Sequence, residues 1–171
     1  MSGGMNPRMK TDPLAREALT ACKRHQQILM LLVDRIPENH LGAVPAGSKG
    51  RDVARQLAHL NRTRLGWLSF HATGKRPELP SSARGERPKK KELKAALKES
   101  GKAVEELLGQ ALRKEARIRL FGKSPVRWLG YLIAHESHHR GQILLALKQS
   151  GFPLDEKVAV QGLWGKWIFG K

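Results

Sequence analysis

Three of the seven histidines in the chain stand close together, at His135, His138 and His139. In a helix that turns by about 100° per residue, His135 and His139 lie one turn apart on the same stripe as Trp128, and this stripe faces inward in a helical bundle. Two imidazoles placed in this way can share one metal ion. His138 points to the flank of the stripe, so its pairing with His135 is poorer. Glu136 lies beside the stripe, at an angle that suits the orientation of an imidazole poorly.

A third metal ligand has to come from another helix, and His59 is the candidate. It falls on a stripe with Gln56 and Thr63 beside a strongly apolar face, a pattern that suggests a helix lining a pocket. Three neutral imidazoles leave one position of a zinc-like ion open to water or substrate, which is typical of catalytic rather than structural sites. The alternative is a hydrogen-bonded His135 in the core, with its two neighbouring histidines in solvent.

Four side chains are candidates to line a pocket around such a site, namely His25, Gln56, Thr63 and Gln142. His25 lies on the inner stripe of its expected helix, where a hydrogen-bonded core histidine is at least as good an interpretation. No residue is assigned a catalytic role. The single cysteine, Cys22, occupies an apolar helix position and is interpreted as a packing residue.

The elements that must position these residues are predicted to be helices. Asp12 followed by Pro13, and Ser124 followed by Pro125, are helix-start signals. Apolar residues recur every three or four positions in four stretches, 13–36, 51–71, 89–114 and 125–150. Since no stretch has a convincing strand pattern, we expect an all-α fold, an up-down-down-up-type four-helix bundle.

Length, charge and composition narrow the class of protein. The 171 residues fit a single domain, 1–171, with a flexible N-terminus at 1–12 and a docked C-terminal segment at 152–171. The longest apolar run is too short to cross a membrane, and one cysteine fits a reducing cytoplasm. The net charge of +17 attracts nucleic acids, anionic lipids or negatively charged small substrates. Because the basic residues are spread over the whole chain, we expect no sequence-specific binding of nucleic acid.

The run AHESHHRGQI at 134–143, together with the earlier Ala58-His59-Leu60, resembles the DinB-like superfamily of four-helix-bundle metalloproteins. This superfamily is distinct from the DNA polymerase that shares the name. The resemblance covers about Leu14 to Gly151, and HHRGQ is its most specific part. The ending GLWGKW at 162–167 is similar to the Trp-containing tails of some members.

The resemblance implies that His59, His135 and His139 form a facial triad for a divalent ion, often nickel or zinc. Characterised relatives include thiol S-transferases and a thiol-dependent isomerase that use low-molecular-weight thiols, and several relatives are homodimers. We therefore expect a metal-dependent enzyme with a small-molecule substrate, thiol S-transferase-like, whose ion activates a thiol or water. The alternative is a basic nucleic-acid-binding or stress-response protein without catalysis, in which the histidines are structural.

A homodimer is also expected because the helix predicted at 125–150 is apolar on its outer side. The residues that stand opposite or beside the histidine stripe are Leu129, Ile133, Leu144 and Leu147. A helix that is apolar all round must be covered on both sides. The alternative cover is the C-terminal segment, which contains Trp164 and Trp167.

Overall fold

In a computed structural model, which describes residues 12–78 and 87–170, the chain is helical, and no strand occurs in these two stretches. The long helices among the described residues are α1 (Pro13–Arg35), α2 (Val53–Thr73), α3 (Lys90–Leu112) and α4 (Pro125–Gln149). The short ones are η1 (Glu38–His40), η2 (Phe121–Lys123), η3 (Val158–Trp164) and α5 (Gly165–Ile168). The predicted all-α fold class is confirmed over this part of the chain.

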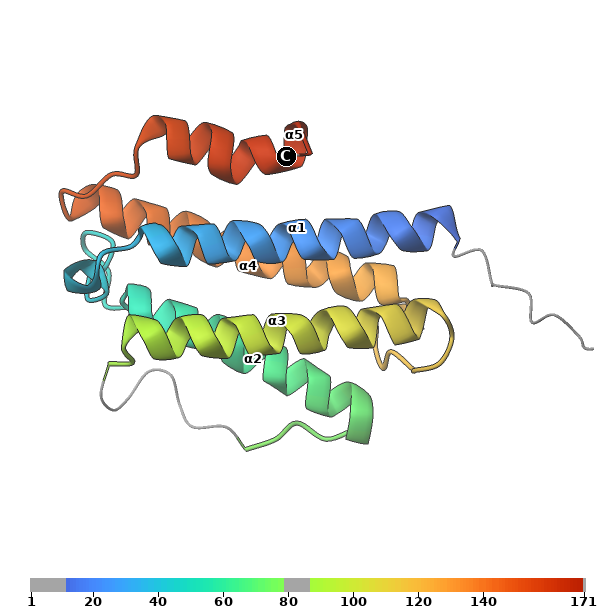
Figure 1. Cartoon of the computed structure of the whole chain (residues 1–171). Helices are drawn as coiled ribbons and strands as arrows, with labels where there is room; N and C mark the ends of the chain where they lie inside the picture. The colour runs from blue at the N-terminus through green and yellow to red at the C-terminus, as the bar shows by residue number, and fades with distance from the viewer. Residues whose placement is uncertain (1–11, 79–86, 171) are drawn as a thin grey trace, which may run out of the picture.

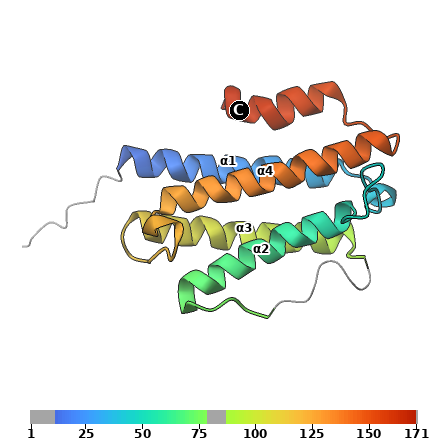
Figure 2. The ribbon, with the colours of Figure 1, turned by 180° about the vertical axis from the view of Figure 1, so that it is seen from behind.

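The long helices lie side by side along one axis (Figure 1). α1 and α4 run in one direction, and α2 and α3 run in the other. α3 packs on both α1 and α2, and α4 also packs on both. Seen from behind, α2 and α4 are neighbours (Figure 2). The two helices that carry the candidate metal ligands are therefore in contact.

Polar caps fix where the helices begin. Asp12 accepts a hydrogen bond from the backbone N–H two residues on at 3.1 Å, and Pro13 opens α1. Ser124 accepts one from the N–H three residues on at 3.3 Å, and Pro125 opens α4. Asp52 caps α2 in the same way at 2.8 Å. The start signals at α1 and α4 are confirmed, because a side-chain oxygen there satisfies an N–H that has no partner within its helix.

Two apolar clusters fill the interior, one of them around the fully buried Trp128. Cys22 belongs to this cluster and is only 6% exposed. Burial raises the pKa of its thiol to about 11, and the nearby Glu105 adds to the shift. The thiol is therefore protonated at neutral pH, and Cys22 is a packing residue as predicted.

The C-terminal segment contacts α1 through η3 and α5 (Figure 1). Leu163 is 3% exposed, and Trp167 packs on the core cluster. Gly162 allows this close approach, because a Cβ there would lie 2.7 Å from the Cδ2 atom of Leu31. By contrast, three large apolar side chains of the segment are exposed by 60% or more: Trp164, Ile168 and Phe169.

Part of the apolar outer side of α4 is covered within a single chain. Leu129 is 6% exposed and Leu147 is fully buried, while Ile133 and Leu144 are partly buried against the core. The two buried leucines therefore carry no argument for a second copy of the chain. The homodimer stays a prediction.

The flexible N-terminus predicted for 1–12 lies, apart from Asp12, outside the described residues. Among the helices that are described, none is long and apolar enough to cross a membrane.

Candidate metal centre

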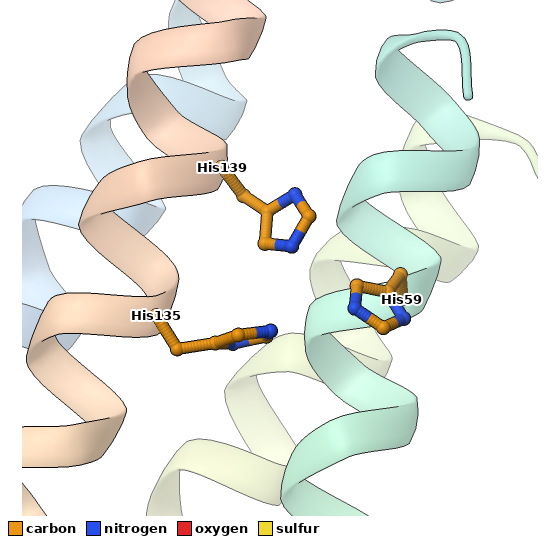
Figure 3. A group of neighbouring side chains, drawn as sticks. All are labelled: His59, His135 and His139. Atoms are coloured by element: carbon orange, nitrogen blue, oxygen red, sulfur yellow. The ribbon is translucent and has the colours of Figure 1, made fainter. Parts of the chain in front are cut away.

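Helices α2 and α4 bring together the three histidines that the sequence singles out (Figure 3). His59 comes from α2, while His135 and His139 come from successive turns of α4. One ligand nitrogen from each lies within 4.8 Å of the other two. The ring centroid of His59 is 5.3 Å from that of His135 and 4.8 Å from that of His139. The rings converge on a common space between the two helices.

The three imidazoles are neutral at pH 7. The pKa of His59 is lowered to about 4, mainly by burial, and Arg51, His135 and Arg62 contribute to the shift. Burial also lowers the pKa of His139 to about 4, with the neighbouring histidines adding to the shift. Burial shifts the pKa of His135 in the same direction. A neutral imidazole keeps a lone pair, which is the form that binds a metal ion.

Hydrogen bonding determines which nitrogen of His139 can bind a metal ion. Its Nδ1 lies 3.2 Å from Oε1 of Gln56, and an amide oxygen can only accept. Nδ1 therefore carries the proton, and Nε2 keeps the lone pair. Such a bond from the non-ligating nitrogen is the usual support of a metal-binding histidine. Gln56 thus lies beside Nδ1 of His139, and its predicted place in a pocket lining stays a prediction.

One buried nitrogen of the site lacks a hydrogen-bond partner in the described part of the chain. Nδ1 of His135 is buried and has no hydrogen-bond partner among the described residues. A buried polar atom without a partner is costly, and a bound cation would satisfy a free imidazole nitrogen. In a tetrahedral site with bonds near 2.0–2.1 Å, nitrogens lie about 3.3 Å apart. A bound ion would therefore have to draw the nitrogens together by up to about 1.5 Å. The residues present fit a zinc-like ion held by three imidazoles.

A cavity of about 320 Å³ opens beside His59 and His135. Its other lining residues are Arg62, Thr63, Gly66, Trp67, Arg76, Pro77 and Tyr131. Thr63, one of the four candidate pocket residues, is among them. Tyr131 was not singled out from the sequence, although it lies one turn before His135 on the same stripe. Its ring stacks on that of His135, with centroids 5.7 Å apart and an interplanar angle of 18°.

Two other predicted pocket residues do not line this cavity. Nε2 of His25 lies 2.9 Å from Oε2 of Glu136, and His25 is 5% exposed, so the core interpretation of His25 is the correct one. Gln142 donates its amide N–H to Nε2 of His138 at 2.9 Å. Gln142 thus contacts His138, which is not one of the three clustered histidines.

The run His135-Glu136-Ser137-His138-His139 also has the letters of HExxH, in which the glutamate is the general base of a metalloprotease. The structure excludes that role. Glu136 is 3% exposed and accepts two hydrogen bonds from Arg64, each 2.6 Å long. Burial tends to raise the pKa of its carboxyl, but Arg64 and His25 outweigh this and lower it to about 2. Glu136 is therefore a structural anion in the core and not a base.

The sequence did not reveal Arg64 as the partner of Glu136. Arg64 is 3% exposed and also donates to Oε1 of Gln26 and to the carbonyl oxygen of Leu97. The resulting network joins all four long helices, because each contributes a group to it. It ties α2 to α4 next to the positions that hold the three histidines. No spacing signal in one helix indicates such a contact between helices.

The fold and the histidine cluster define an all-helical protein with a site suited to a divalent ion. The chain belongs to the DinB family, whose family model matches residues 8–164. No curated protein matches the chain.

Proposed function

We propose that this protein is a divalent-metal-dependent enzyme of the DinB type, in which His59, His135 and His139 hold a zinc or nickel ion. In this proposal the long helices form the up-down-down-up bundle of the superfamily, with the C-terminal segment docked on it. The observation that carries the proposal is the convergence of three neutral imidazoles, one of them with an unpartnered buried nitrogen, beside an open cavity.

The proposed reaction is the transfer of a group to a low-molecular-weight thiol, with hydrolysis by water as the alternative. A bound ion would supply Lewis acidity, which lowers the pKa of a thiol or water at its open position. Gln56 fixes the proton of His139 on Nδ1, and Tyr131 holds the ring of His135 in place by stacking. The cavity next to His59 would receive the small-molecule substrate. The choice of a thiol rests on the resemblance of the sequence to the superfamily.

The test of this reaction is a conjugation assay on zinc- or nickel-loaded protein, with N-acetylcysteine as the thiol and monobromobimane as the electrophile. We expect conjugation to be faster than in solution without the protein. A chelator and His139→Ala should abolish this acceleration, and His138→Ala should retain it. Loss of the electrophile without added thiol would indicate the hydrolase instead. Fully metal-loaded protein that accelerates neither the conjugation nor the thiol-independent loss of the electrophile would contradict the proposal.

We further propose a homodimer in the cytoplasm that does not bind nucleic acid in a sequence-specific manner. The exposed apolar side chains of the C-terminal segment, among them Trp164 and Ile168, support a second copy as their cover. Light scattering at micromolar concentration is the check, and a monomer mass would refute the dimer. Binding to duplex DNA that discriminates among sequences at physiological salt would favour the nucleic-acid alternative.

A further inference from the structure

The charged side chains that line the cavity beside the three histidines are all positive. Two arginines, Arg62 and Arg76, line it, and no acidic side chain does so within the described parts of the chain. A concave site lined by charges of one sign attracts ligands of the opposite sign. The volume of about 320 Å³ lies at the lower end of the range for small-molecule sites. A cavity of this volume accommodates a small molecule.

We propose that the cavity binds a small molecule with two ends, a reactive end at the histidines and a carboxylate or phosphate held by Arg76. This inference rests on the proposed function, because it names the class of substrate for the same site. It adds a charge requirement and a length requirement that a metal centre alone does not impose.

Arg76 is placed to act as the anion-binding group. Its Cζ atom lies 4.6 Å from the centroid of the Trp67 ring. Trp67 is 8% exposed, so the ring is a fixed platform for the guanidinium. Stacking occupies the flat face of a guanidinium and leaves the N–H groups at its edge, which pair with a carboxylate or phosphate in bidentate fashion.

An aromatic wall connects Arg76 to the metal end of the cavity. The Trp67 ring meets the Tyr131 ring edge to face, with centroids 5.6 Å apart, and Tyr131 stacks on His135. The successive contacts place the arginine at one end of the wall and a candidate metal ligand at the other. A ligand lying along this wall would contact the side chains of Trp67 and Tyr131 between its two polar ends.

The length of the ligand follows from the residues that α2 contributes to the cavity. His59, Thr63 and Gly66 line it from α2, at spacings of four and three residues, which places them on one face of the helix. At 1.5 Å per residue, the distance from His59 to Gly66 along the axis is roughly 10 Å. A Cβ added to Gly66 would meet no atom within 4 Å, so the cavity is open at this position. Because Arg76 lies over Trp67, the residue after Gly66, the anionic group and the reactive group of the ligand are separated by roughly 10 Å along this face.

The test compares acids with uncharged alcohols of the same length. Zinc-loaded protein, its metal content measured first, is titrated calorimetrically with 6-mercaptohexanoate and with 6-mercaptohexanol. We expect the acid to bind about tenfold more tightly, because a guanidinium pairs only with the acid. The shorter pair, 3-mercaptopropionate and 3-mercaptopropanol, should differ by less than about threefold, because a three-carbon chain cannot reach from the metal to Arg76.

Two variants with matched controls assign the effect to this cavity. Arg76→Gln should remove most of the preference for the long acid, whereas Arg16→Gln, an equal loss of charge at an exposed site on α1, should preserve it. Gly66→Leu should weaken binding of both long probes by filling the cavity, and Gly130→Leu, at an exposed open position on α4, should not.

The outcomes separate this inference from the proposed function. Protein that binds zinc but prefers neither long probe, or whose preference survives Arg76→Gln, would overturn the anion site and leave the metal site standing. Protein that binds no zinc would overturn the proposed function. The anion site would then be tested with hexanoate against hexanol on the metal-free protein, where equal affinities would refute it as well.

Discussion

The buried ion pair between Arg64 and Glu136 gives a prediction whose magnitude follows from the structure. Glu136→Gln keeps the shape of the side chain but removes the charge that Arg64 and His25 contact. The pKa of Glu136 is about 2, against an ordinary value of 4.5. At 1.36 kcal/mol per pKa unit, the charged form contributes about 3 kcal/mol to the free energy of unfolding at pH 7. We expect Glu136→Gln to lower the free energy of unfolding by about this amount, in line with the known cost of breaking a buried pair.

The pH dependence of the stability difference between wild type and Glu136→Gln gives a second, independent test. Because the pKa of Glu136 is lower in the folded than in the unfolded chain, the unfolded state binds more protons between pH 4.5 and 2. The contribution is therefore complete above pH 4.5 and is lost as the pH falls towards 2. The difference between wild type and Glu136→Gln should shrink across this window.

The assay is urea unfolding followed by circular dichroism at several pH values from 7 to 3. Glu115→Gln is the control, because Glu115 forms an exposed ion pair with Arg113, and such pairs contribute little. A Glu136→Gln variant as stable as wild type at pH 7 would refute the reasoning. So would a difference that stays constant down to pH 3.

Three further predictions concern the site and the packing around it. Gln56→Leu should weaken zinc binding by about tenfold in a chelator competition, because it removes the hydrogen bond to Nδ1 of His139. The circular dichroism spectrum should stay unchanged. An unchanged zinc affinity would show that Gln56 does not support His139 as a ligand. Zinc affinity should change little between pH 7 and 5.5 and fall steeply near pH 4, where the pKa values of His59 and His139 lie; release centred at the ordinary histidine pKa of 6.5 would contradict this. In thermal unfolding, Gly66→Ala should stabilise by about 1 kcal/mol, because its Cβ meets nothing. Gly101→Ala should destabilise, because its Cβ would displace the Gln26 amide from its hydrogen bonds to Arg64 and Leu97. The opposite order would disprove the packing described.

The sequence predicts the elements of the fold because their signals are local. The caps at Asp12 and Ser124 and the three- to four-residue spacing of apolar side chains act within one helix. The same is true of His135 and His139, whose separation of one turn places them on one stripe. His59 could be matched to them through its own polar stripe on α2.

The contacts between helices could not be predicted in this way. Whether Glu136 faces the metal site or the core depends on how α4 is rotated against α1 and α2, and Arg64 and His25 determine this only once the helices are packed. The weak periodicity of the C-terminal segment has a different cause. The part from Val158 to Trp164 is π-helical, so an α-helical period does not describe it.

The central claim is that three histidines from two helices hold one metal ion, and elemental analysis of untagged protein after loading with zinc or nickel tests it most directly. The account predicts about one ion per chain in wild type and in His138→Ala, and none in His59→Ala, His135→Ala or His139→Ala. Wild type without stoichiometric metal, or a loss in His138→Ala as large as in the other three variants, would contradict it.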